Sequence, residues 1–574
     1  MAWSWAEKSR RIFPQRDHSR YVGNNMKKTF TLIVFVVFSL LFLAVYHFNN
    51  STIKRTISET EKIASLGKIY GFLKYYHPEV GKGKYNWDKE FIKYLPKVLA
   101  TTDKQSLSSI YISWIDNLGT VEVCKKSDLN GNYFNKNFDL SWSQDTHLFN
   151  TKLASKLKYI EENRILEENF YITNEPAGKI KVTNEPNYSD FEYPNEEYRL
   201  LGLFKYWNII EYFYPYKYLT DQNWNSVLLE MIPKFRNASS KYEYQYAIKE
   251  LIAKLDDTHA WINFTDNRPK YLPVKISRIE NKAVVSAFRN DSLANLNQLK
   301  LGDVILKIND LDIATEVINE SKYVSGSNTN IKIRNSYYRI LDGIDSTIKL
   351  TILRDDLVKE IEARRYNFDD FNNNNNLTKN KSKSINNKIG YIDMAYVKGE
   401  DISNIFKMFE NKEAIIIDLR NYPAFIYKLF SSYINNERKD FAKVYSPYIS
   451  YPGKFIIKKK LQTGSSKKAF KGKVYLLVND KSISRSEFTA MAFQTSKNVT
   501  TIGNQTAGAD GDVVVFEYMG GYKTAISGNG ILYPDGSETQ RKGIKIDIEV
   551  KPTIKGLLNG KDEVLEKAIE LASQ

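Results

Sequence analysis

The chain has 574 residues, of which 42% are hydrophobic and 26% are charged. This composition excludes a chain that is disordered throughout, and the length predicts about three or four domains. The formal net charge of +16 is one that nucleic-acid-binding proteins often carry. Beyond the first 28 residues, however, the lysines are mostly dispersed among acids, and no zinc-finger or basic-zipper pattern occurs. We therefore expect a lysine-rich solvated surface and no nucleic-acid partner.

The N-terminus carries a targeting signal. Residues 1–28 hold seven basic and two acidic residues, and residues 29–48 hold no full charge. Twenty such residues are enough to cross a bilayer, and the preceding basic residues predict a cytoplasmic N-terminus. We expect a single-pass membrane anchor with the C-terminal bulk in the periplasm or outside. A cleaved signal peptide, which would give a secreted protein, is the alternative, and a start at Met26 would make residues 1–25 an extension.

Two stretches of the first half resemble each other at an offset of 137 residues. Residues 70–78 pair with 207–215, and the register needs no gap over roughly 50 residues. In both copies apolar and aromatic residues recur at helical spacing before a proline. We expect two related helical bundles, one in residues 51–190 and one in 195–268.

The scarce cysteines and histidines restrict the chemistry. The one cysteine, Cys124, excludes a disulfide framework and a thiolate-rich metal site. No cluster has metal-ligand spacing, so the sequence predicts no metal and no cofactor. The second helical copy ends in L-D-D-T-H-A, with His259 at the position where the first copy has Glu122. His77 is matched by Tyr214, so we expect a packed helix-end residue there. His259 is the histidine that lies in a distinctive segment.

Residues 271–360 alternate as strands. Residues 299–309 resemble the L-x-x-G-D-x-I-x-x-I-N signature of a PDZ domain, a module that binds peptides by adding a strand to its sheet edge. A generic small β domain is the alternative. Residues 369–387 are a polar, Asn-rich stretch that predicts a flexible linker.

Residues 388–574 have an α/β pattern. A buried strand over 473–479 runs into D-K-S-I-S-R-S-E-F, where helical spacing begins. Ser482, Ser484 and Ser486 therefore lie between a strand end and a helix start. Backbone amides there favour developing negative charge, and a hydroxyl can act as a nucleophile if a base reaches it. Helix capping is the alternative role for these serines.

Four features occur in the order found in the C-terminal processing and tricorn-type (tail-specific) serine peptidases. They are the PDZ-like module, D-L-R-N at 418–421, the S-x-S-x-S-E segment and the C-terminal K-G-I-K-I-D-I-E-V. The resemblance covers about residues 195–574. It implies a multidomain α+β fold with a ClpP/crotonase-like α/β catalytic core in 388–574, a PDZ-like β domain and N-terminal helical bundles. It also implies that Ser484 is the nucleophile.

The same resemblance selects the base. The processing branch uses a lysine 25 residues after the serine, where this chain has Ala509. The tricorn branch uses a histidine in an L-G-T-S-H-A-like segment, which L-D-D-T-H-A resembles. The resemblance is therefore nearest to the tricorn-like branch, and it implies a Ser484–His259 pair in which imidazole moves the hydroxyl proton.

The remaining site residues also follow from the resemblance. It implies Glu538 as the carboxylate that orients the imidazole, whereas strict spacing from Gly543 selects Gln540. The oxyanion hole would use the backbone N–H groups of Ala424 and Arg485, although family members often have glycine at the first position.

The resemblance implies a membrane-anchored, exported serine endopeptidase of a bacterial envelope that acts on peptide or protein substrates. The alternative is a catalytically inactive protein on the same fold that binds peptides or apolar ligands. The altered oxyanion strand and the missing lysine are compatible with such a protein.

Overall fold

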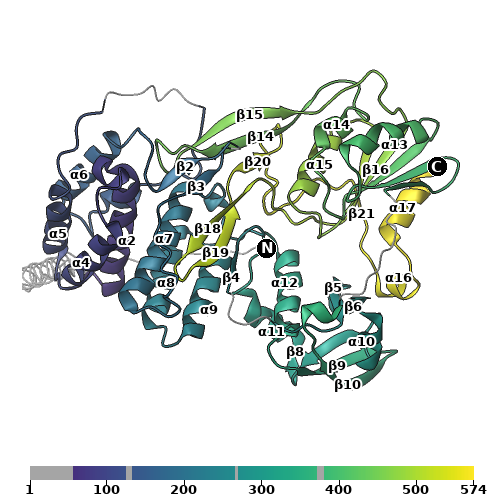
Figure 1. The fold of residues 1–574 in the computed structure, drawn as a ribbon, viewed down its shortest axis with the longest axis horizontal. Coiled ribbons are helices and arrows are strands. Elements are labelled where there is room, and N and C mark those ends of the chain that lie inside the picture. The colour runs from purple at the N-terminus through teal and green to yellow at the C-terminus, as the bar shows by residue number, and fades with distance from the viewer. Residues whose placement is uncertain (1–55, 125–131, 177, 265–268, 372–380) are drawn as a thin grey trace, which may run out of the picture. The chain divides into compact units, whose positions relative to one another are not determined.

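The computed structural model describes residues 56–574 except for 125–131, 177, 265–268 and 372–380. The predicted leader and the predicted membrane segment, residues 29–48, lie outside the described residues. Of the helices that are described, none is both long and apolar enough to cross a membrane. Ser58–Gln574 forms one compact unit, and its helices and sheets give a mixed, multidomain architecture (Figure 1).

Two sets of helices repeat with the predicted offset. The first set is α2 (Glu59–Tyr76), α3 (Pro78–Gly81), α4 (Trp87–Leu99) and α5 (Lys104–Asp116), and the second is α7 (Glu196–Phe213), α8 (Trp224–Asn237) and α9 (Lys241–Ala253). Corresponding helices begin 137 residues apart. Each begins after a Ser, Asn or Asp whose side chain accepts a backbone N–H, as helix N-caps do: Ser58, Asn86, Asp103, Asn195, Asn223 and Ser240.

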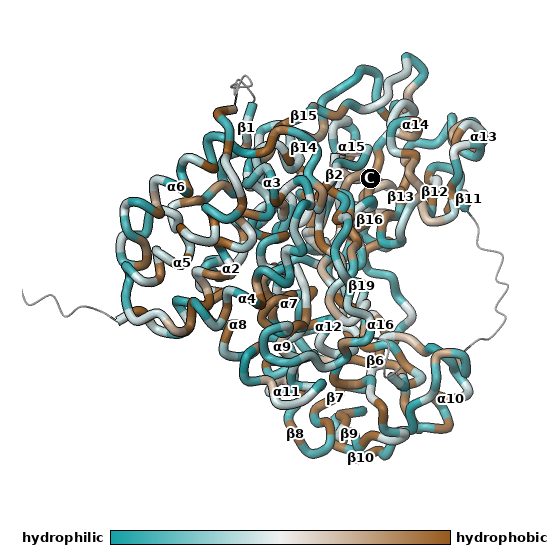
Figure 2. Tube along the Cα trace, turned by 60° about the vertical axis from the view of Figure 1, so that its left-hand side comes forward, coloured by the Kyte–Doolittle hydropathy of each residue, from teal (hydrophilic) through white to brown (hydrophobic). Residues whose placement is uncertain are grey.

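Equivalent positions of α2 and α7 face each other, so these two helices run parallel. A Cβ atom on Gly67 would lie 2.2 Å from the Phe204 ring, and one on Gly71 would lie 1.8 Å from the Asn208 side chain. Both glycines are therefore needed for this close approach. The Asn208 amide donates to the carbonyl oxygen of Gly67 (3.0 Å). α7 is buried along most of its length, and its trace in Figure 2 includes brown, hydrophobic stretches.

Short elements connect the copies to the C-terminal half. They are β1 (Tyr133–Phe134), η1 (Ser141–Gln144), α6 (Thr151–Glu162), β2 (Ile172–Asn174), β3 (Ile180–Val182), η2 (Lys217–Leu219) and β4 (Trp261–Asn263). β2 pairs with β3. β1 joins β15 (Phe455–Gln462), β14 (Asp440–Pro447) and β20 (Gly530–Leu532), while β4 joins β19 (Tyr522–Ser527) and β18 (Val513–Tyr518). Segments far apart in sequence are thus held together by strand pairing.

The segment predicted to be PDZ-like folds as a six-stranded sheet with helices. The strand order is β10-β9-β7-β6-β5, and β8 pairs with β7. The strands are β5 (Val274–Ile279), β6 (Lys282–Phe288), β7 (Val304–Ile308), β8 (Leu311–Asp312), β9 (Thr347–Arg354) and β10 (Leu357–Arg364). The helices are α10 (Asp291–Leu296), α11 (Ile313–Ser321) and α12 (Thr329–Leu341), and η3 (Phe368–Phe371) follows the sheet.

The C-terminal sheet has the order β11-β12-β13-β16-β17-β21 and is parallel except for β11. Its strands are β11 (Ser382–Ser384), β12 (Ile389–Asp393), β13 (Ala414–Asp418), β16 (Lys473–Val478), β17 (Val499–Gly503) and β21 (Ile548–Glu549). β11 lies inside the segment predicted to be a linker, because edge pairing of the backbone needs no apolar side chain. Its helical elements are η4 (Gly399–Asp401), α13 (Ile402–Met408), α14 (Tyr427–Ser431), α15 (Arg485–Phe493), α16 (Ile554–Leu558) and α17 (Glu563–Ala572).

Both faces of this sheet are covered. Ile415 and Ile417 of β13 pack with α13, α14 and α15, whereas Ile416 packs with α17 on the other face. Such burial on both faces accounts for the uninterrupted apolar run of β13. Because β13 and β16 pair in parallel, their carboxyl ends lie side by side (Figure 1).

Candidate active site

Ser484 lies in the short connection between β16 and α15. Its backbone has φ 55° and ψ −114°, a conformation that residues other than glycine rarely adopt. The Ser484 N–H donates to the Ala509 carbonyl oxygen (2.9 Å) and to Glu487 Oε2 (3.2 Å). Ser484 is thus the N-cap residue of α15, and its unusual backbone angles are maintained by two acceptors.

The three serines of the cluster have different environments. Ser482 Oγ donates to the Leu419 carbonyl oxygen (2.9 Å), and Ser486 Oγ to that of Asn421 (3.5 Å). Both serines are fully buried. Ser484 is partly exposed, and no described residue accepts a hydrogen bond from its hydroxyl. Ser482 and Ser486 therefore fix the connection to the end of β13, while Ser484 presents a hydroxyl.

Glu487 joins the serine connection to the segment 506–511. Its buried carboxylate accepts hydrogen bonds from Thr506 Oγ1, from Gly508 N–H (2.8 Å) and from Ala509 N–H (3.0 Å). Burial raises the pKa of Glu487, and these donors oppose the shift. Ala509 stands where a lysine base would be, and its backbone is used to position Ser484 instead.

His259 lies between α9 and β4 and is almost completely buried. Its Nδ1 is 3.0 Å from Ser527 Oγ. Asp257 accepts hydrogen bonds from the backbone N–H groups of both His259 (3.0 Å) and Ser527 (2.9 Å). Because β4 pairs with β19, which ends at Ser527, the ring is held between two segments 268 residues apart. Burial lowers the pKa of His259, and the carboxylates of Asp257 and Asp512 oppose this.

Ser484 and His259 are related through the segments 510–512 and 527–529. No hydrogen bond joins the Ser484 hydroxyl to the His259 ring in the described part of the chain. Asp512 lines the pocket at Ser484, and its carboxylate also raises the pKa of His259. Asn529, two residues after Ser527, lines the same pocket.

The two predicted orienting residues have different positions. Glu538 Oε1 accepts a hydrogen bond from the Tyr218 hydroxyl (2.6 Å) and lies 3.4 Å from Lys136 Nζ, so its carboxylate belongs to another cluster. Gln540 Nε2 donates to Asp257 Oδ1 (3.3 Å). Asp257 is thus the carboxylate next to His259. Asp257 lies in the L-D-D-T-H-A segment, where its spacing from His259 alone does not identify it, and no sequence pattern points to Ser527.

The backbone N–H groups of Ala424 and Arg485 have no acceptor among the described residues. The Arg485 guanidinium donates to the Pro423 carbonyl oxygen (3.3 Å), and it lies 5.1 Å from the Tyr422 ring centroid and 5.6 Å from that of Phe425. Arg485 therefore connects the 422–425 segment to the serine connection.

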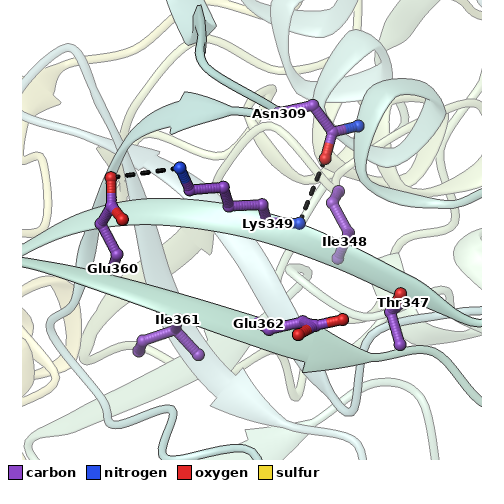
Figure 3. A pocket seen from close by; sticks show the side chains of 7 residues that line it. All are labelled: Asn309, Thr347, Ile348, Lys349, Glu360, Ile361 and Glu362. Carbon is purple, nitrogen blue, oxygen red and sulfur yellow. Dashed lines mark hydrogen bonds and ion pairs between the residues drawn. The ribbon is translucent and has the colours of Figure 1, made fainter.

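Ser484 opens into a pocket of about 500 Å³. It is lined by Tyr422, Phe425, Tyr427, Val444, Leu461, Ser484, Arg485, Phe488, Asp510, Gly511, Asp512, Asn529 and Ile531. A second hollow of about 480 Å³ lies on β9 and β10. Figure 3 shows Lys349 there: its Nζ pairs with Glu360 (3.3 Å), and its backbone N–H donates to Asn309 Oδ1 (3.1 Å). In the described ranges no three His, Cys, Asp or Glu side chains are grouped so that they could bind a metal ion.

Comparisons with known proteins give one family match and several similar folds. The family model of peptidase family S41 matches residues 388–550. Mature CPAF complexed with lactacystin has a similar fold, with a TM-score of 0.54 and 13% identity, covering 66% of this chain and 98% of that chain. Mature CPAF alone gives a TM-score of 0.53 and 13% identity, covering 66% and 97%. No curated protein matches the sequence.

Proposed function

The chain belongs to peptidase family S41 and is a serine-type peptidase, and we propose that it cleaves peptide bonds with Ser484 as the nucleophile and His259 as the general base. The contrast among the three serines carries this proposal. Ser482 and Ser486 are buried and donate to the end of β13, whereas Ser484 has a positive φ and lines a pocket. A strained nucleophile between a strand and a helix N-terminus is a recurring arrangement in hydrolases.

In the proposed reaction Ser484 Oγ attacks the carbonyl carbon of the substrate, and the hydroxyl proton passes to His259 Nε2. His259 Nδ1 is bonded to Ser527, which leaves Nε2 for this role. The acyl-enzyme forms when the peptide C–N bond breaks and His259 returns the proton to the leaving amine. Water, deprotonated by His259, then releases the acid. The reaction requires Ser484 Oγ and His259 Nε2 to come within hydrogen-bonding distance of each other.

We assign the orientation of His259 to Asp257 and Ser527, supported by their hydrogen bonds to its backbone and ring. Gln540 Nε2 donates a hydrogen bond to Asp257 and so helps to hold this carboxylate in place. Glu538 receives no catalytic role in this proposal, because its carboxylate is engaged with Tyr218. The unbonded N–H groups of Ala424 and Arg485 would stabilise the oxyanion.

The finer architecture is part of the same proposal. We retain residues 271–360 as a PDZ-like domain, residues 388–574 as a ClpP/crotonase-like core and residues 29–48 as an anchor that exports the bulk of the chain. β5 is an edge strand of its sheet, which supports the addition of a peptide strand. Asn328, the N-cap residue of α12 in the same module, donates to the Thr506 and Ala507 carbonyl oxygens, so the module is joined to the segment that accepts bonds near Glu487.

A fluorophosphonate probe tests the nucleophile directly. We expect the full chain to be labelled at Ser484, and labelling to disappear in Ser484→Ala and His259→Ala. Ser109→Ala, an exposed serine of α5, is the control and should be labelled like the wild type. Absence of labelling in wild-type protein with a cooperative thermal transition would favour the catalytically inactive binding protein and overturn the proposal.

A further inference from the structure

One wall of the pocket at Ser484 is aromatic. The ring centroids of Phe425 and Tyr427 are 5.3 Å apart, and that of Phe488 lies 6.2 Å from Phe425 and 5.0 Å from Tyr427. Phe441 packs behind them, 5.2 Å from Tyr427 and 5.0 Å from Phe488. Contacts of this kind fix the rings against one another. The four rings therefore form one continuous aromatic surface, of which Phe425 is 64% exposed.

The position of Phe488 links this wall to the chemistry. Phe488 follows Ser484 by four residues in α15, so the two lie on the same side of the helix, one turn apart. Side chains on a helix lean toward its N-terminus, which directs the Phe488 ring toward Ser484. Val444, Leu461 and Ile531 line the pocket as well. A side chain next to a carbonyl bound at Ser484 Oγ would thus contact aromatic and aliphatic groups.

Resting on the proposed function of Ser484, we propose that this pocket binds the side chain of the residue whose carbonyl is attacked, and that the enzyme cleaves after large apolar residues, aromatic ones above all. The pocket volume of about 500 Å³ lies within the roughly 300–1,000 Å³ of sites that enclose small ligands. It therefore has room for the largest apolar side chains.

The charged groups of the pocket do not favour a charged substrate side chain. Arg485 is bonded to Pro423 and lies over Tyr422 and Phe425, so its guanidinium is already engaged. Burial and the nearby Glu487 carboxylate raise the pKa of Asp510 well above its usual range. The Asp512 carboxylate accepts a hydrogen bond from Asn529 (3.3 Å) and disfavours acidic side chains. Arg485 and Asp512 already have partners within the protein, and the aromatic and aliphatic side chains of the lining match an apolar side chain of the substrate.

The test measures kcat/KM for matched peptides that differ only in the residue before the cleaved bond, either Phe, Leu, Ala, Lys or Asp. Apolar pockets discriminate by about 10- to 200-fold per methylene-sized difference. We expect Phe and Leu to exceed Ala by about 30-fold and Asp to be the poorest. The ratio of kcat/KM for the Phe peptide to that for the Ala peptide should fall about tenfold in Phe488→Ala and in Phe425→Ala. Because Phe425 is exposed, we expect the Phe425→Ala protein to keep the stability of the wild type. Phe368→Ala, an exposed phenylalanine of η3, should keep the wild-type ratio.

The outcomes separate the two proposals. If Ser484 reacts with the fluorophosphonate probe but cleavage shows no apolar preference, or if both phenylalanine variants keep the wild-type ratio, the pocket assignment is wrong and the nucleophile stands. If the probe does not label the folded protein, the proposed function itself fails.

Discussion

The two helical copies have the same scaffold and different ends. Trp87 Nε1 donates to the Tyr70 carbonyl oxygen (3.0 Å), and in the second copy Trp224 Nε1 donates to that of Trp207 (3.1 Å). Each last helix is followed by a buried leucine, Leu118 or Leu255. From there the copies diverge: the second leads to His259 and β4, while the first leads to exposed residues.

The residue after each buried leucine, Gly119 in the first copy and Asp256 in the second, differs between the copies. Gly119 has φ 90°, and its equivalent Asp256 has φ 50°. A helix commonly ends with glycine in this conformation, so an aspartate there costs roughly 1 kcal/mol. The Asp256 carboxylate offsets this cost by pairing with Lys332 and by accepting a hydrogen bond from the Asp221 N–H (2.7 Å). The helices provide a scaffold, and the few residues after them provide the chemistry.

Substitution at the equivalent positions Glu122 and His259 gives the largest expected difference between the copies. His259→Ala should lower kcat by about 10³-fold or more, because it removes the proposed general base for the Ser484 hydroxyl. Glu122→Ala, an exposed residue, should leave kcat unchanged. Peptide hydrolysis by the two variants provides the measurement. Retention of more than about a tenth of the activity in His259→Ala would exclude this residue as the base.

Asp257 has no counterpart in the first copy, where the equivalent residue is Thr120. Asp257→Asn should lower kcat by about 100-fold, because an amide nitrogen cannot accept the hydrogen bonds that orient the His259 segment. It should also move the pH profile. His259 acts as a base when neutral, and burial lowers its pKa below the usual value of 6.5, so kcat/KM should rise with a midpoint below about pH 6.5.

The direction of the shift in the variant follows from charge. The Asp257 carboxylate raises the pKa of His259, so its removal should move the midpoint to lower pH. Ser527→Thr keeps a hydroxyl near Nδ1 and is the conservative control, for which we expect a wild-type midpoint. A shift to higher pH in Asp257→Asn would contradict the proposed role of this carboxylate.

The substitution Asp256→Gly gives the second copy the glycine that the first copy has at the equivalent position, Gly119. It removes the ion pair with Lys332 and the acceptor for the Asp221 N–H, but it relieves the positive φ. We expect kcat to fall about tenfold, since the His259 segment loses an anchor, with a change in the free energy of unfolding within about 1 kcal/mol. Urea unfolding together with kcat measures both quantities. An unchanged kcat would show that Asp257 and Ser527 alone hold the segment.

Much of this comparison could be predicted from sequence, because it depends on local patterns. The offset of 137, the prolines and the aromatic spacing predicted two related sets of helices, and helix caps are short-range signals. His77 was expected to pack at a helix end, and it is buried at the end of α2, where burial lowers its pKa to about 4. The resemblance to serine peptidases followed from ordered motifs, and the model of peptidase family S41 matches residues 388–550.

The surroundings of His259 and Ser484 depend on contacts between segments far apart in the sequence, which local patterns do not encode. Ser527 meets His259 because β4 pairs with β19 across more than 260 residues. Glu538 and Gln540 were alternatives by spacing alone, and their positions are decided by partners on distant segments, Tyr218 and Asp257. The positive φ of Ser484 was likewise not visible, since a serine at a helix start normally indicates an ordinary cap.

Substitution of Gly119 tests whether the turn after the last helix of each copy needs the left-handed backbone conformation, and its expected effect is the smallest. No atom lies within 4 Å of where its Cβ would be, so Gly119→Ala adds backbone strain at φ 90° without a clash. We expect a loss of about 1 kcal/mol in the free energy of unfolding and no change in kcat. Gly71→Ala, whose Cβ would meet the Asn208 side chain, is the contrasting variant and should cost about 1–3 kcal/mol through overpacking. A stabilised Gly119→Ala protein would show that this turn does not need the left-handed conformation, and Asp256 would then carry no strain that its ion pair must offset.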